Sequence, residues 1–260
     1  MSDSPTVHQV TPLSRPDCVA SVLAGFARQR VHKHLTLAIN GPLAAEVWAA
    51  LPRELPDDVT PILTRPGKPA ALNTALAGLR GCLVAVRDDD DVQLAGDLAE
   101  CVRAMADTGA EIVSRHKHWV WDTSEDKLWL LGEHLAQQWG DHRLSGGSLL
   151  FHCDLNTPEF PDQRVGESVE WAKRMCQAGA RVWRPSVNHQ VFIRGRSDHL
   201  FDGGPSLGVC PRLIGEARVR AVYGRAHKAR CYGKPTPEHQ AMCRGEIPWL
   251  AIAHTIEPLR

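Results

Sequence analysis

The stretch at 81–91, GCLVAVRDDDD, joins an apolar run to four consecutive aspartates. The run at 81–86 has the length and apolar character of a buried strand. Adjacent carboxylates raise one another's pKa values unless a cation or solvent relieves them. Their hard oxygens suit Mg²⁺ or Mn²⁺, although a solvated acidic turn fits the same residues equally well. The stretch therefore predicts a buried strand that ends in either a divalent-metal site or an acidic turn.

Short apolar runs alternate with helical patterns on both sides of this stretch. Strands are expected at 6–13, 35–39, 59–63, 81–86 and 111–115. Helices are expected at 17–29, 44–51, 70–79 and 94–108. This alternation predicts βαβ units and a parallel sheet, in which ligands bind at the carboxyl ends of the strands. We therefore expect Asn40, at the end of one strand, to share a crevice with the aspartates.

The composition is that of an ordinary globular chain and argues against several classes of protein. The 260 residues are 43% hydrophobic, and 30 Lys and Arg balance 30 Asp and Glu. Zero net charge argues against a nucleic-acid binder. No apolar run approaches the roughly 20 residues of a membrane span, and no secretory signal precedes the first strand. The eight cysteines are scattered without a CxxC pair, which is typical of reduced thiols. We expect a cytoplasmic protein.

Several further segments follow one another in a recognisable order. Before the aspartates these are PLSRP at 12–16, LTLAIN at 35–40 and GKPAALNTAL at 67–76; after them come LSGGSLLF at 144–151, FPD at 160–162, GES at 166–168, and 192–201 from FIR to DHLF. Together they resemble glycosyltransferase family 2. The resemblance implies an α/β chain of GT-A fold, with a Rossmann-like, mainly parallel mixed sheet flanked by helices.

The resemblance also implies a division of the chain. The GT-A domain would cover residues 1–204, with a donor-binding half at about 1–115 and an acceptor-binding half at about 116–204. Residues 205–260 would form a C-terminal appendage packed on this core.

A donor site and a metal site follow from the same resemblance. Asp88 and Asp90 match the metal-binding DxD pair, with Asp91 as an alternative ligand, and His199 would approach the metal or the diphosphate. Asn40 stands where the family commonly has an aspartate that contacts the nucleobase. The implied donor-binding residues are Leu13, Arg15, Asn40, Lys68, Asn73, Asp88, Asp89 and Arg194, and Arg65 and Arg87 are further candidates for the diphosphate. The implied cofactor is Mn²⁺ or Mg²⁺.

The catalytic base is expected in the GES segment, where family members place a carboxylate. Ser168 replaces the second acidic residue of the family pattern, so Glu167 is the first candidate, and Asp162 or Glu170 could substitute. Such a base must come within about 2.6–3.2 Å of the acceptor hydroxyl. Trp119 and Trp121 are candidates for stacking on a sugar, because aromatic rings pack against its apolar faces.

The implied reaction is inverting transfer of a sugar from a nucleoside diphosphate sugar, a UDP- or GDP-sugar, to an acceptor hydroxyl. The acceptor would be a glycan or a small molecule, no nucleic acid would take part, and homodimer formation is left open. Two other functions stay open. A metal-dependent nucleotidyl or phosphoryl transferase also needs aspartates after a strand, although the chain has no GxxxxGK[ST] loop. A nucleotide-sugar-binding protein with a degraded site would fit Asn40 and Ser168.

Overall fold

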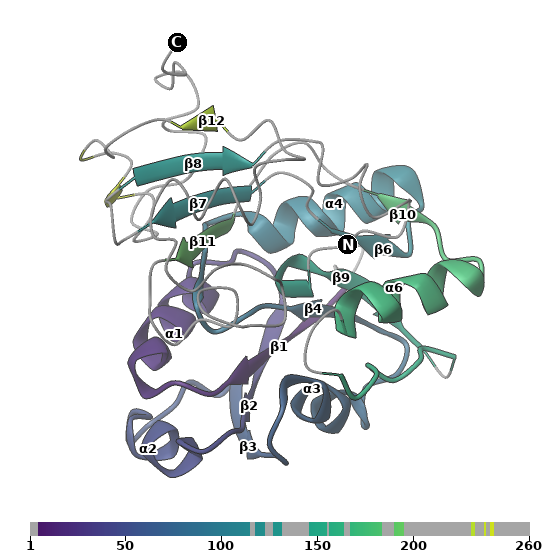
Figure 1. Ribbon diagram of the computed structural model, residues 1–260. Coiled ribbons are helices and arrows are strands. Elements are labelled where there is room, and N and C mark those ends of the chain that lie inside the picture. Colours follow the sequence, from purple (N-terminus) through teal and green to yellow (C-terminus); the bar gives the residue numbers. More distant parts are fainter. Residues whose placement is uncertain are drawn as a thin grey trace.

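The computed structural model describes residues 5–114, 118–122, 127–131, 146–154, 156–163, 167–183, 190–194, 230–231, 237 and 240–241. Within these residues a seven-stranded sheet forms the centre of the fold, in the order β10-β6-β9-β4-β1-β2-β3 (Figure 1). Its strands are β1 (Val7–Leu13), β2 (Lys33–Ile39), β3 (Val59–Leu63), β4 (Cys82–Val86), β6 (Ile112–Val113), β9 (Leu150–Cys153) and β10 (Val182–Trp183).

This sheet is mixed but mainly parallel. Strands β1, β2, β3 and β4 are parallel to one another, and β6 is parallel to β10. Strand β9 runs antiparallel between β4 and β6. The carboxyl ends of β1, β2 and β4 therefore lie along one edge, as the alternation of strands and helices predicts.

Helices cover both faces of the sheet, as Figure 1 shows. The helices are α1 (Val19–Ala27), α2 (Ala44–Ala49), α3 (Lys68–Leu76), α4 (Asp97–Thr108) and α6 (Glu167–Gln177), with short 3-10 turns η1 (Pro16–Cys18) and η2 (Gly146–Ser148). Alternate residues of each strand face opposite layers. Leu83 and Ala85 pack toward α4, whereas Val84 and Val86 pack toward α3 and α6.

The predicted elements of the first half are confirmed within a few residues. The strand at 59–63 has the predicted bounds, and the predicted helix at 17–29 divides into η1 and α1. Helix α3 begins at Lys68, two residues before the expected start, because Gly67 adopts a φ of 105° and Pro69 occupies the first turn, where proline is well tolerated.

A second sheet, which the sequence patterns do not indicate, stands beside the first. Its order is β12-β8-β7-β11-β5 in the described part of the chain. Its strands are β5 (Asp91–Gln93), β7 (His118–Asp122), β8 (Lys127–Leu131), β11 (Gln190–Arg194) and β12 (Arg230–Cys231). Strand β5 starts at the last of the four aspartates and pairs antiparallel with β11. The aspartates therefore occupy the connection between the two sheets.

Candidate functional site

The four aspartates meet the end of β1 at the carboxyl edge of the central sheet. The Asp89 Oδ2 atom accepts hydrogen bonds from the backbone N–H of Ser14 (2.8 Å) and from its hydroxyl (3.1 Å). The guanidinium of Arg15 also donates to the Asp89 carboxylate. Asp89 is 5% exposed, and burial raises the pKa of its carboxyl while Arg15 works against that rise. Asp89 thus joins the loop after β1 to the loop after β4.

The other three aspartates form a cluster that could hold a metal ion. Each of Asp88, Asp90 and Asp91 offers a carboxylate oxygen, and these three oxygens lie within 4.8 Å of one another. Magnesium and related hard cations prefer oxygen ligands and are usually bound through one or two carboxylates together with substrate phosphates. The donor set therefore fits Mg²⁺ or Mn²⁺.

Two cationic side chains flank this cluster. Arg15 lies 3.3 Å from the Asp90 carboxylate, in addition to its contact with Asp89. The Lys68 ammonium lies 2.6 Å from Asp88 Oδ1 and 3.4 Å from Glu167 Oε1. Burial disfavours the charged form of Lys68, but Asp88 and Glu167 outweigh this effect and raise its pKa. The edge of the sheet thus carries alternating charges suited to an anionic ligand with a metal ion.

Glu167 is the candidate base that the structure connects to the aspartates. It opens α6, is 9% exposed, and accepts a hydrogen bond of 3.0 Å from the Ser168 hydroxyl. Asp162 is exposed, and Glu170 is engaged with Lys173 and Arg174 on its own helix. Among these three carboxylates, the described contacts join Glu167 alone to the aspartate cluster, through Lys68.

The glycine loop at η2 packs directly against the aspartate cluster. A Cβ atom at Gly147 would lie 2.8 Å from Asp88 Oδ2 and 3.1 Å from Asp91 Oδ2. Real Cβ atoms essentially never approach so closely, so a side chain at this position would displace Asp88. The family resemblance puts this loop in the acceptor-binding half and does not indicate its contact with the aspartates. The paired glycines of the LSGGS segment were the available signal.

Three of the predicted donor-binding residues pack against or hydrogen-bond other parts of the protein. Leu13 is completely buried in the core between β1 and α1. The Asn73 amide donates to the Phe160 carbonyl (2.9 Å) and accepts from the Phe160 N–H (2.8 Å), so it ties α3 to the segment that precedes α6. Asn40 ends β2, is 5% exposed, and donates to the Ala38 carbonyl. Its contact with a nucleobase stays a prediction.

Arg87 faces the interior and not the diphosphate-binding edge. Its guanidinium lies 2.6 Å from the Asp97 carboxylate and donates to the Leu149 carbonyl. Arg87 and Asp97 are 3% and 1% exposed, so the expected diphosphate contact of Arg87 is wrong. Trp119 is also fully buried, which leaves no ring face for a sugar.

Two further predicted site residues, His199 and Arg194, have side chains outside the described part of the structure. His199 is outside the described residues. Arg194 ends β11, and its side chain is likewise not described.

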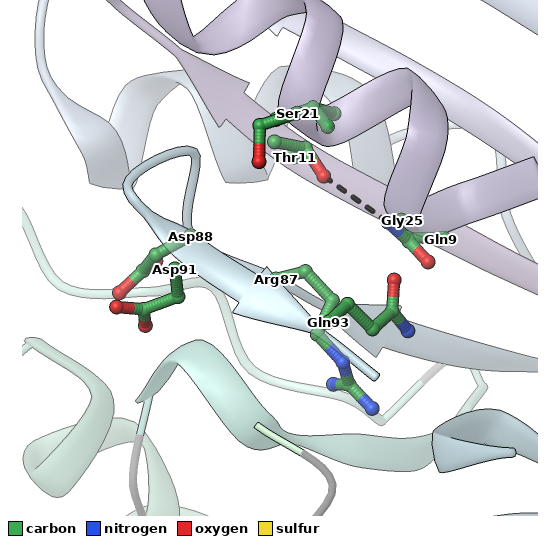
Figure 2. A pocket seen from close by; sticks show the side chains of 9 residues that line it. Gln9, Thr11, Ser21, Gly25, Arg87, Asp88, Asp91 and Gln93 are labelled. Carbon is green, nitrogen blue, oxygen red and sulfur yellow. Dashed lines mark hydrogen bonds between the residues drawn. The ribbon is translucent and has the colours of Figure 1, made fainter. Parts of the chain in front are cut away.

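A small polar pocket lies behind the cluster, between β1, α1 and β5. Figure 2 shows Gln9, Thr11, Arg87 and Gln93 along it, with Asp88 and Asp91 at its other end. It has room for about one water molecule. A nucleotide sugar is therefore too large for this pocket.

Comparison with known proteins supports the fold. No protein-family model matches the chain, and no curated protein matches its sequence. A crystal structure of S. aureus TarS 1–349 shares 14% identity, covering 72% of this chain and 60% of that one, with a TM-score of 0.55. A second, in complex with UDP-GlcNAc, shares 12% identity, covering 75% and 60%, with a TM-score of 0.54.

The chain shares the mixed α/β, Rossmann-like fold of these TarS structures. At 14% and 12% identity the likeness establishes the fold, and membership of glycosyltransferase family 2 stays a prediction. The aligned part spans 60% of the length of each TarS structure.

No helix in the described part of the chain has both the length and the apolar character that crossing a bilayer requires.

Proposed function

We propose that this protein is a metal-dependent, inverting glycosyltransferase that moves a sugar from a nucleoside diphosphate sugar to an acceptor hydroxyl. One observation carries the proposal: a cluster of Asp88, Asp90 and Asp91 at the carboxyl edge of the sheet is joined through Lys68 to the buried Glu167. Candidate metal ligands, a cation and a candidate base would thus meet at one edge of the sheet. The fold shared with a structure in complex with UDP-GlcNAc supports a UDP-sugar as donor.

The donor would bind across the ends of β1, β2 and β4. Asp88 and Asp90 would hold Mn²⁺ or Mg²⁺, with Asp91 as a further ligand, and a bound ion would neutralise charge on the leaving diphosphate. Arg15 and Lys68 would face the same diphosphate, while Asn40 would contact the nucleobase. Asp89 would act indirectly, because its contacts with Ser14 and Arg15 hold the loop that receives the donor.

Glu167 would take the proton from the attacking hydroxyl. Glu167 lies 3.4 Å from the Lys68 ammonium and accepts a 3.0 Å hydrogen bond from the Ser168 hydroxyl, and these contacts would orient its carboxyl group. The serine at 168 therefore supports the neighbouring glutamate and does not leave the site without a carboxylate. This arrangement favours an active enzyme over a binding protein with a degraded site.

Thermal unfolding with UDP- and GDP-sugars, with and without Mn²⁺, tests donor binding, because a ligand of the folded state raises its stability. We expect one class of nucleotide sugar to raise the unfolding temperature, and to do so more strongly with Mn²⁺ than with EDTA. Unchanged unfolding temperatures with all donors would contradict the proposal.

Release of UDP or GDP from the donor that binds tests the chemistry. Glu167→Gln keeps the shape of the side chain but removes the proton acceptor, so turnover should fall about 100-fold or more while donor binding persists. Glu170→Gln is the matched control and should retain turnover, since Glu170 pairs with Lys173 and Arg174. Equal losses in the two variants would assign the base elsewhere. A wild-type protein that binds donor without any turnover would favour the binding-protein function.

A further inference from the structure

Lys68 forms a bridge between two carboxylates that serve different parts of the proposed reaction. Its ammonium contacts Asp88, a member of the metal-binding cluster, and Glu167, the candidate base. The three residues come from the start of α3, the end of β4 and the start of α6. We call this arrangement the Lys68 bridge.

The position of Lys68 is unfavourable for its own helix. The N-terminus of a helix carries partial positive charge, which stabilises anions and destabilises cations there. Lys68 is nevertheless the first residue of α3. The two carboxylates compensate for this placement, so the lysine is held by the site and not by the helix.

The contact between Lys68 and Asp88 is accessible to a competing ion. The Lys68 side chain is 30% exposed and that of Asp88 is 26% exposed, so an ion from solvent can reach the carboxylate. The flexible lysine stem lets the ammonium move without displacing the backbone. A divalent ion bound through Asp88 would share this carboxylate with the ammonium and repel it.

We propose that Lys68 is the resident cation of the free site, which a divalent ion must displace from Asp88. This inference rests on the proposed function. The released ammonium would turn to the diphosphate of the donor, where its charge becomes favourable again. Metal alone would therefore bind weakly, whereas metal and nucleoside diphosphate would strengthen each other's binding, as thermodynamic linkage requires of coupled ligands.

Mn²⁺ titration of the full chain by calorimetry, with and without UDP as the probe nucleotide, tests this inference. Without UDP, Lys68→Met should bind Mn²⁺ about fivefold or more tightly than wild type, because the competing charge is gone. Lys68→Arg keeps the charge and should resemble wild type. Lys173→Met removes an exposed lysine paired with Glu170 and is the matched control. UDP should increase Mn²⁺ affinity more in wild type than in Lys68→Met.

The direction of the change in Mn²⁺ affinity separates this role of Lys68 from a structural one. A lysine that merely supports the fold would lower Mn²⁺ affinity when it is lost. Lys68→Gln provides a second neutral variant, and circular dichroism verifies that both are folded. Equal or weaker Mn²⁺ binding by the folded neutral variants would overturn the inference and leave the proposed function standing. Absence of Mn²⁺ binding by every variant, with or without UDP, would overturn both.

Discussion

The four consecutive aspartates are alike in sequence but differ in their surroundings. Asp89 is buried and receives donors from Ser14 and Arg15, whereas Asp88, Asp90 and Asp91 turn their oxygens toward one another. Unrelieved like charges at this spacing destabilise the folded state. One aspartate therefore organises the loop, and the other three form the candidate cation site.

This difference predicts opposite effects of the same substitution. Asp89→Asn should lower the free energy of unfolding by about 2 kcal/mol, because the amide loses the charge that pairs with Arg15 and turns one of the two acceptor oxygens into a donor. Asp90→Asn should leave stability unchanged or raise it, because relief of like-charge repulsion offsets the loss of its 3.3 Å contact with Arg15, while Mn²⁺ binding is lost. Urea unfolding measures the first effect and calorimetry the second. Equal destabilisation by the two variants would show that Asp90 is also a structural residue.

The η2 loop, the loop after β4 and helix α6 pack closely around the candidate site. An added methyl group in the η2 loop would therefore contact the aspartates. The η2 loop packs its Gly147 against the carboxylates that follow β4, while α6 brings Glu167 to the other side of Lys68. The α6 helix is in turn anchored by Trp171, whose indole N–H donates to the Pro158 carbonyl and whose ring stacks on Phe160. The site geometry thus depends on how η2 and α6 pack on the sheet.

Gly147→Ala should weaken Mn²⁺ binding about tenfold or more, a usual effect of disturbing groups that orient metal ligands. The new Cβ would meet Asp88 Oδ2 at 2.8 Å and push that carboxylate out of the cluster. Gly78→Ala is the matched control, because a Cβ there meets no described heavy atom within 4 Å. The same titration measures both variants. Unchanged affinity in Gly147→Ala would mean that Asp88 is not a ligand.

At the scale of the whole molecule, a buried ion pair connects the two sheets. Arg87 follows β4 of the central sheet, and its partner Asp97 also accepts from the Gln93 amide of β5 in the second sheet. Arg87 additionally donates to the Leu149 carbonyl beside β9. This network fixes the segment that contains the aspartates between the two sheets.

Arg87→Met should lower the free energy of unfolding by about 3 kcal/mol, because it leaves the buried Asp97 without its cation. Arg174→Met removes an exposed arginine paired with Glu170 and should stay within about 0.5 kcal/mol of wild type. Urea unfolding followed by circular dichroism compares the two. A small effect at Arg87 would show that the sheets are held together mainly by other contacts.

The amino-acid sequence by itself determined the strands and helices of the first half and the strand that ends in aspartates. Hydrophobic periodicity is local, so short-range patterns suffice for such elements. The same patterns predict that Asn40 and the aspartates lie at one edge of the sheet, because the carboxyl ends of parallel strands lie along the same edge.

Only the tertiary structure decided which side chains meet there. It directed Arg87 to Asp97, joined Asn73 to Phe160, and brought Glu167 toward Asp88 through Lys68. These partners lie on different elements, and their meeting depends on side-chain direction and on how helices pack against the sheet, which local periodicity does not encode. The second sheet escaped prediction for the same reason: its strands are short and, apart from the hairpin of β7 and β8, pair across long separations in the chain.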